Sequence, residues 1–233
     1  SDALAADPRC RADIDPQALF DYVHFHMIPR PGTAYRDIHR LRPGEALVIH
    51  ARGVQARSYW QPDFEEDGPT SRADLAAAFR TRLRTAVSVQ ADFGPTGTFL
   101  SGGTDSSTLT GMLGEVTGEA PRAYSIGFDT PGYDELEFAR IVARRFDAHH
   151  REYIVTPEDV AAAIPKLAAG FDQPYGNASA VPTYYCAQLA RADGMTALIG
   201  GDGGDELFAG NARYAKQWVL SLYQRLPAAM RRG

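Results

Sequence analysis

From residue 71 onward, segments with a helical period alternate with short apolar runs, and this alternation leaves few folds open. Strands are predicted at 97–100, 123–128, 152–155 and 195–200, with helices between them. Such an alternation is typical of parallel βαβ units. We therefore expect an α/β fold in which an open parallel sheet carries helices on both faces. Ligands of such sheets bind beyond the carboxyl ends of the strands.

Local signals refine three positions in this pattern. Ser71 and Asp74 predict a capping box at the start of the first helix. The helix over 157–170 is predicted to be kinked or broken at Pro165, because proline cannot donate the helical hydrogen bond. The pair His149–His150 lacks the spacing of metal ligands and is interpreted as a polar lead-in to the strand that follows.

The first part of the chain has a different pattern. A short helix is predicted over 16–27 and a β-hairpin over 45–60. The seam at 61–72 is rich in acidic residues, glycine and proline, as linkers are. We therefore expect two domains, 1–62 and 71–233. A helix and a hairpin bury little apolar surface alone, so the first zone is expected to need a partner surface.

Composition excludes several classes of function. The chain is 44% hydrophobic and 23% charged with a net charge of −5, so it has no basic footprint for nucleic acid. No apolar run approaches the roughly 20 residues of a membrane span, and the polar N-terminal segment does not resemble a signal peptide. The two cysteines form neither a disulfide framework nor a zinc spacing, which favours a reducing, cytoplasmic compartment. Because the chain begins with Ser, we expect either processing or a longer parent protein.

A glycine-rich loop follows the strand at 97–100. Gly102 and Gly103 lead directly into a helix, so several backbone N–H groups gather at a helix N-terminus, which is an anion site. Glycine lets the backbone approach an anion closely because it has no Cβ. The loop contains no lysine and does not match the Walker A pattern. Ser101, Ser106 and Ser107 add hydroxyl donors to the cradle.

Asp105 is the unexpected member of this loop. A carboxylate in a phosphate cradle repels its ligand unless a cation lies between them, and Mg²⁺ binds through one or two carboxylates together with phosphate oxygens. Asp105 therefore predicts a magnesium ion. The structural alternative is that Asp105 only complements the dipole at the start of the helix.

A second glycine-rich loop, 199–210, combines five glycines with three acidic residues between a strand and a helix. Asp205 is the natural candidate for a second magnesium ligand, and Asp202 is placed to face a substrate. Glu206 is expected only to complement the helix dipole. The alternative for the acidic residues as a group is a solvated surface loop.

Two further segments leave alternatives open. Ile126, at the end of a predicted strand, either packs against an adenine ring or is an ordinary core residue. The turn-rich stretch 171–191 holds four polar residues that either line a substrate site or cap the following helix: Asp172, Gln173, Asn177 and Ser179.

Four segments in order resemble one known family. SGGTDS (101–106) resembles the S-G-G-x-D-S "PP-loop" of ATP pyrophosphatases, and GGDGGDELFAGNARY (200–214) resembles the second signature of their asparagine synthetase branch. DQPYGNASAVPTYY (172–185) is similar to a further stretch of that branch. The segment 24–60 resembles the last part of its glutamine amidotransferase domain.

This resemblance implies an ATP- and Mg²⁺-dependent ligase with an adenine-nucleotide α-hydrolase-like fold. Such an enzyme adenylates a substrate carboxylate, releases pyrophosphate, and forms an amide when ammonia or an amine attacks the acyl carbon. By position, the pyrophosphate of ATP is expected to contact Ser101, Gly102, Gly103, Asp105 and Ser106. Asp105 and Asp205 are expected to ligate Mg²⁺, and Asp202 to lie near the reacting carboxylate. The adenosine is expected to contact Phe99 or Leu100, Ile126, and the backbone of Gly200 and Gly201.

The sequence departs from the family pattern in three respects. Neither Cys10 nor Cys186 matches the N-terminal nucleophile of the glutaminase domain, most of which is missing, so glutamine hydrolysis is not expected. Gly200 replaces a serine of the signature and Asn211 replaces a tyrosine. The family's synthetase domain extends beyond residue 233 and there contributes a lysine, so a C-terminally truncated domain is expected.

The leading hypothesis is therefore an asparagine-synthetase-like amide-forming ligase. Its substrate is a small-molecule carboxylate, with aspartate among the candidates, and its partner is the missing amidotransferase portion or a second polypeptide. A related alternative is a β-lactam synthetase or peptide cyclase acting on another carboxylate. The alternative from a different class is a non-catalytic module that binds a nucleotide or a partner.

Overall fold

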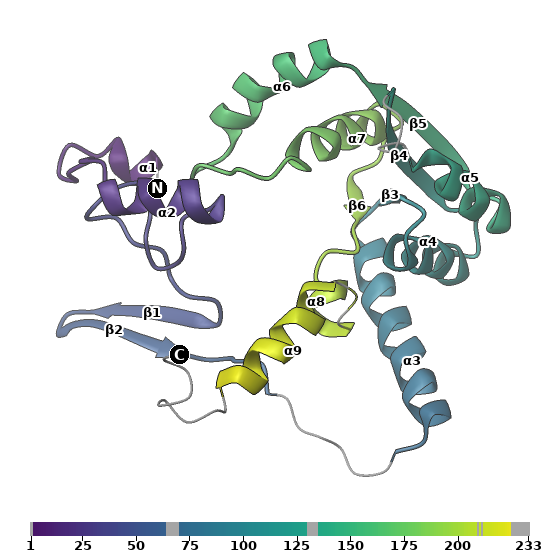
Figure 1. The fold of residues 1–233 in the computed structure, drawn as a ribbon, viewed down its shortest axis with the longest axis horizontal. Helices are drawn as coiled ribbons and strands as arrows, with labels where there is room; N and C mark the ends of the chain where they lie inside the picture. Colours follow the sequence, from purple (N-terminus) through teal and green to yellow (C-terminus); the bar gives the residue numbers. More distant parts are fainter. Residues whose placement is uncertain (1, 64–69, 130–134, 209, 211, 225–233) are drawn as a thin grey trace. The chain divides into compact units, whose positions relative to one another are not determined.

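The computed structural model describes residues 2–63, 70–129, 135–208, 210 and 212–224 of the 233-residue chain (Figure 1). The chain divides into two compact units. One consists of Ser1–Ala77 and Val155–Tyr185, and the other of Ala78–Ile154 and Cys186–Gly233. We call them the N-terminal unit and the sheet unit and describe each by itself. The predicted domain boundary between residues 62 and 71 remains a prediction.

The sheet unit is built on a four-stranded sheet. Its strands are β3 (Thr96–Phe99), β4 (Arg122–Phe128), β5 (His149–Val155) and β6 (Ala197–Ile199), in the order β5-β4-β3-β6. β3 pairs in parallel with both β4 and β6. The helices that lie wholly or mainly in this unit are α3 (Arg72–Ala91), α4 (Thr104–Thr117), α5 (Leu136–Arg145), α7 (Ala180–Ala192), α8 (Gly204–Phe208) and α9 (Ala212–Gln224).

Helices cover both faces of this sheet. On one face Leu100 packs with Ala139 of α5, and Ile199 of β6 packs in a cluster with α3 and α4. On the opposite face Tyr124 of β4 packs with Cys186 and Ala190 of α7. Successive strand residues point to opposite faces, which explains why neighbours along one strand meet different helices. The predicted α/β fold with a parallel sheet between helices is confirmed.

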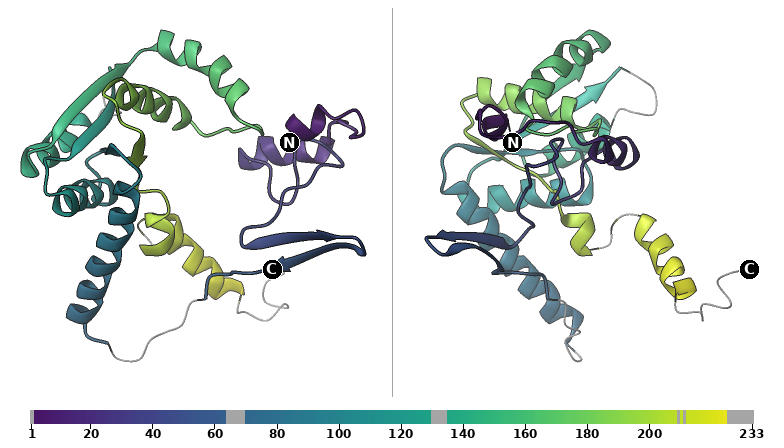
Figure 2. Two further views of the ribbon diagram at one scale, coloured as in Figure 1. Left: turned by 180° about the vertical axis from the view of Figure 1, so that it is seen from behind. Right: turned by 90° about the vertical axis from the view of Figure 1, so that its left-hand side faces the viewer.

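The N-terminal unit contains α1 (Asp2–Ala5), α2 (Pro16–Phe25), β1 (Glu45–His50), β2 (Gly53–Ser58) and α6 (Pro157–Gly170). The predicted hairpin is confirmed: β1 and β2 pair antiparallel, as both views of Figure 2 show. The predicted short helix is present as α2 and ends two residues early, because His26 adopts a left-handed conformation. Buried residues are few in this part, and large apolar side chains such as Phe20, Val23 and Ile49 are exposed.

Three local predictions have different outcomes. The break predicted at Pro165 is wrong, because α6 runs through that residue as one helix with a capping box between Thr156 and Asp159; the alternative of a kink stays a prediction. β5 begins at His149, so the histidine pair belongs to the strand and does not merely precede it. Ser71 caps α3 as predicted, because its hydroxyl accepts the N–H of Asp74 at 3.1 Å.

Candidate nucleotide site

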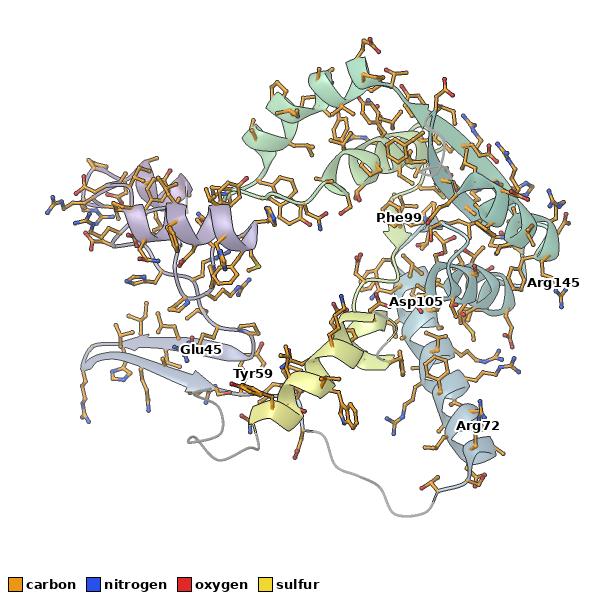
Figure 3. All side chains as sticks on the ribbon, in the orientation of Figure 1. Glu45, Tyr59, Arg72, Phe99, Asp105 and Arg145 are labelled. Atoms are coloured by element: carbon orange, nitrogen blue, oxygen red, sulfur yellow. The ribbon has the colours of Figure 1, made fainter. Side chains whose placement is uncertain are left out.

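The first glycine loop joins the carboxyl end of β3 to the N-terminus of α4. Figure 3 shows Phe99 at the end of the strand and Asp105 in the first turn of the helix. Gly103 occupies the N-cap position, and no side chain caps the first turn. The first N–H groups of a helix have no partner within the helix. The loop therefore presents backbone donors and the positive end of the α4 dipole, the arrangement that binds anions.

Serine hydroxyls fix the shape of this loop. Ser106, which is buried, accepts the N–H of Ser101 at 3.2 Å and donates to the carbonyl of Gly103 at 3.3 Å. The Ser101 hydroxyl lies 3.1 Å from that of Ser106 and accepts the N–H of Gly103 at 3.3 Å. Ser107 also donates to the Gly103 carbonyl, at 2.6 Å. The predicted anion-binding serines are thus brought together, and they also hold the loop in position.

Gly102 allows the loop to touch α5. Its φ is +86°, a left-handed value that favours glycine. A Cβ at this position would lie 2.6 Å from the backbone nitrogen of Ala139, closer than any real contact. Gly102 is therefore required both for its conformation and for the contact with the first turns of α5.

A buried pair of hydroxyl groups joins β3 to α4 beneath the loop. Thr98 and Thr110 have no exposed surface, and their hydroxyl oxygens lie 2.8 Å apart. Thr110 donates to the carbonyl of Ser106 at 2.8 Å, so its only proton is used and Thr98 must donate to it. Both ends of the loop are thereby fixed to each other through the interior.

The second glycine loop lies against Asp105. A Cβ at Gly204 would come within 2.8 Å of the Asp105 carboxyl carbon, and one at Gly201 within 2.9 Å of the Asp105 Cβ. The structure thus places the Asp105 carboxylate beside the residue that precedes Asp205. Asp205 itself is half-buried, and its carboxyl carbon would lie 3.3 Å from a Cβ at Gly210. Asp202 is exposed.

The donor set suits a magnesium ion that arrives with a nucleotide. Among the described residues no cluster of three or more His, Cys, Asp or Glu side chains is placed to hold a metal. A metal held by protein ligands alone needs such a cluster. Mg²⁺ commonly uses one or two carboxylates and takes its other oxygens from phosphate and water. Asp105 and Asp205 fit that second pattern, and their role as ligands remains a prediction.

The residues predicted to contact adenosine divide between the two faces of the sheet. Phe99 and Ile126 pack against the same cluster around Tyr124, and Phe99 lies 3.5 Å from the place of a Gly200 Cβ. Leu100 is only 2% exposed and its side chain packs toward α5. The Leu100 side chain is therefore not available to a ligand, and its N–H already donates to the carbonyl of Tyr124 at 2.9 Å.

Two residues behind the loop were not singled out from the sequence as part of the site. The hydroxyl of Ser125 on β4 donates to the carbonyl of Leu100, and it lies 2.7 Å from Nε2 of His150 on β5. Burial lowers the pKa of His150, and the nearby carboxylate of Glu152 opposes that shift. In the sequence, Ser125 lies inside a predicted strand and His150 lies just before another, and neither position implies a contact between the two strands.

The polar residues of 171–191 make local contacts within the N-terminal unit. Asn177 accepts the N–H of Ser179 at 2.9 Å and its hydroxyl at 2.8 Å, just before α7 begins. The Gln173 side chain accepts the N–H of Ala34 at 2.7 Å. These contacts favour the helix-capping interpretation for Asn177 and Ser179, and they give Gln173 a structural role.

Residues 78–233 match the family model described as asparagine synthase. The chain belongs to the asparagine synthase family. Residues 1–60 match a second model, described as a glutamine amidotransferase domain. The predicted family is thus confirmed, together with the resemblance of the first segment to an amidotransferase domain.

Curated relatives of this asparagine synthase family member align with nearly its whole length. Asparagine synthetase [glutamine-hydrolyzing] 1 of Bacillus subtilis is 28% identical over 94% of the chain and 35% of the relative. A putative asparagine synthetase of Methanocaldococcus jannaschii is 30% identical over 95% of the chain and 43% of the relative. The chain therefore spans less than half the length of these two relatives.

Among solved structures, an NMN synthetase from Francisella tularensis aligns with a TM-score of 0.40 and 18% identity over 52% of each chain. None of the described helices is long and apolar enough to cross a membrane.

Proposed function

We propose that this chain contributes the ATP-binding part of an amide-forming ligase. The nucleotide would lie across the two glycine loops, with its pyrophosphate on the loop before α4. The observation that carries the proposal is the position of the Asp105 carboxylate against Gly204, between the anion-binding loop and the acidic loop. A carboxylate in that place suits a nucleotide whose charge is neutralised by Mg²⁺.

The proposed reaction has two steps. An oxygen of the substrate carboxylate attacks the α-phosphorus of ATP, which forms an acyl-adenylate and releases pyrophosphate. Ammonia or an amine then attacks the acyl carbon, and AMP leaves as the amide forms. The magnesium ion would neutralise the pyrophosphate, which lets it leave without a fixed lysine.

The chain's own residues would act mainly by position and electrostatics. The first-turn N–H groups of α4 would hold the pyrophosphate oxygens, and the hydroxyls of Ser101 and Ser106 would turn from their contacts within the loop to donate to them. Asp105 and Asp205 would ligate the metal, and the exposed Asp202 would face the carboxylate substrate. Phe99 and Ile126 would contact the adenosine from the face that α7 covers. Aspartate is the first substrate to test, and the nitrogen donor is left open.

We also propose that the N-terminal segment packs on further protein. The match of 1–60 to an amidotransferase domain and the exposure of Phe20, Val23 and Ile49 support a partner surface there. The occupant would be the remaining amidotransferase portion or a second polypeptide. The boundary between the two proposed domains, 1–62 and 71–233, would fall in the seam between them.

The test is ATP–pyrophosphate exchange with aspartate and a panel of other carboxylates. Asp105→Asn and Asp205→Asn are expected to lower exchange by at least about tenfold, since each removes a charged ligand. Glu119→Gln is the matched control, because Glu119 follows the opposite end of α4 and is exposed. Exchange that survives both aspartate substitutions at the wild-type rate would refute the site. Normal ATP binding without exchange on any carboxylate would favour the non-catalytic alternative.

A further inference from the structure

A chain of polar contacts runs behind the nucleotide loop, through the sheet unit. Ser125 is 3% exposed and the His150 side chain is 10% exposed, although both carry polar atoms. The Ser125 hydroxyl contacts the carbonyl of Leu100, the residue between β3 and the loop. A buried carbonyl without a donor costs free energy. Ser125 therefore supplies the partner that the Leu100 carbonyl needs at the end of β3.

The direction of the protons follows from the partners. A carbonyl only accepts, so Ser125 spends its single proton on Leu100. The Ser125 oxygen must then accept from Nε2 of His150, 2.7 Å away. The histidine carries a proton on Nε2 in this arrangement, whether or not Nδ1 is also protonated. His150 thereby selects the one hydroxyl orientation of Ser125 that points at the loop.

The same chain continues to the helix that supports the loop from its other side. Nδ1 of His150 lies 3.3 Å from Oε1 of Glu152, and it donates to that carboxylate only when the ring is doubly protonated, because Nε2 carries the proton given to Ser125. Glu152 accepts two hydrogen bonds from the Arg140 guanidinium on α5, at 2.8 Å and 2.6 Å. Paired bonds of this kind fix the orientation of both groups.

The contacts close a ring around the beginning of the loop. Arg140 follows Ala139, the residue whose backbone nitrogen meets Gly102 so closely that no side chain fits between them. One side of the ring thus holds the Leu100 carbonyl and the other side meets Gly102. Leu100 and Gly102 flank Ser101, whose hydroxyl is the first of the proposed pyrophosphate cradle. A shift of His150 would reach the cradle from both sides.

We propose that His150 is a positioning residue for the nucleotide: it orients Ser125, which holds the Leu100 carbonyl and so sets the pyrophosphate-binding loop. The inference rests on the proposed function, because it assumes that the loop positioned by these contacts binds the pyrophosphate of ATP. His150 does not touch the nucleotide in this account. An interpretation in which His150 only satisfies buried polar groups predicts lower stability without any specific change in ATP binding.

The test compares three substitutions in the full chain, with Mg·ATP binding measured by calorimetry. His150→Leu removes the donor to Ser125 and is expected to weaken binding by about tenfold. His150→Gln places an amide N–H where Nε2 was, and is expected to restore affinity to within about threefold of wild type. His150→Asn ends its amide near the place of Nδ1, so it should behave like leucine. It replaces that variant if His150→Leu does not fold.

A second measurement separates this proposal from the proposed function. Hydrogen exchange of the amides at 101–106, without nucleotide, is expected to be faster in His150→Leu and normal in His150→Gln. If wild type does not bind ATP, the proposed function fails while the exchange pattern still tests the positioning. Wild-type affinity in His150→Leu, or loop exchange that does not differ between the leucine and glutamine variants, would overturn the inference.

Discussion

The Asp105 carboxylate lies against the backbone of Gly204, although the two residues are far apart in the sequence. Asp105 belongs to the first turn of α4, and Gly204 begins α8. Parallel strands end at the same edge of a sheet, so the loops after β3 and β6 are neighbours. The close approach is possible because Gly204 has no side chain. This relationship brings the two acidic glycine loops into contact.

Gly204→Ala should impair the site more than the fold. The new Cβ would lie 2.8 Å from the Asp105 carboxyl carbon, so the carboxylate must move. A side-chain end can turn away at little cost, and unfolding free energy is expected to change by less than about 1 kcal/mol. Affinity for Mg·ATP should fall by about tenfold or more. Gly170→Ala is the control, because nothing lies within 4 Å of that Cβ position. Unchanged affinity in Gly204→Ala would speak against a role for this contact.

Gly102→Ala should be much more harmful than Gly118→Ala. Both glycines have left-handed φ values, +86° and +70°, so both substitutions carry a strain of about 1–2 kcal/mol. Only Gly102 faces a neighbour, since a Cβ there would meet the backbone of α5 and one at Gly118 meets nothing. We expect Gly102→Ala to lose clearly more stability in urea unfolding and to lose ATP binding as well. Equal losses in the two variants would show that the contact with α5 is unimportant.

The buried pair Thr98 and Thr110 gives a test of how the loop is tied down. Thr110→Val keeps the shape of the side chain but leaves the Thr98 hydroxyl without its partner, at a cost of about 1–3 kcal/mol. Thr98→Val should cost less, because Thr110 still donates to the Ser106 carbonyl. The double variant should be less destabilised than the sum of the two single variants. Additive losses, measured by urea unfolding, would mean that the two hydroxyls are not coupled.

The buried histidine predicts how stability depends on pH. The pKa of His150 lies below the ordinary value of 6.5, chiefly through burial, so the unfolded chain binds more protons just below that pH. The part of the unfolding free energy that depends on a neutral His150 is therefore fully present above pH 6.5. It is lost as the pH falls through the pKa of His150 in the folded protein. His150→Gln should remove this part of the pH dependence, as followed by thermal unfolding across the window. A wild-type slope that persists in His150→Gln would assign it to other groups.

Glu152 contributes to stability in a second, more acidic pH range, and His150→Gln should leave that contribution unchanged. Hydrogen bonds from Arg140 hold the pKa of Glu152 below 4.5, so the stability it contributes is lost only on further acidification. The two groups act in the same direction at different pH values. His150→Gln should therefore keep the loss of stability below pH 4.5.

The sequence was sufficient for the architecture and for placing the two glycine loops at the ends of strands. The helical and strand periods predicted the sheet and its helices on both faces, and the glycines marked the turns at strand ends. The neighbourhood of Asp105 and the acidic loop followed from the rule that parallel strands end at one edge. Pro165 shows the limit of local signals, since the rest of α6 outweighs one missing donor.

The polar ring was beyond the reach of sequence patterns. Ser125 and His150 lie on different strands, and their contact depends on how β4 and β5 align across the sheet. A histidine pair at the start of a strand gives no indication of which ring faces inward. The orientation of Leu100, just before the loop, could not be predicted either. Only the structure shows that its side chain packs toward α5 while its carbonyl accepts from Ser125.

The most direct test of one nucleotide site made from two loops is calorimetric titration of ATP with and without Mg²⁺, in wild type and in Asp105→Asn. We expect Mg²⁺ to strengthen ATP binding by at least about tenfold in wild type and to have little effect in Asp105→Asn, because the metal would link the carboxylate to the phosphates. Equal strengthening by Mg²⁺ in both proteins would contradict the account, since the ion would then be bound without Asp105.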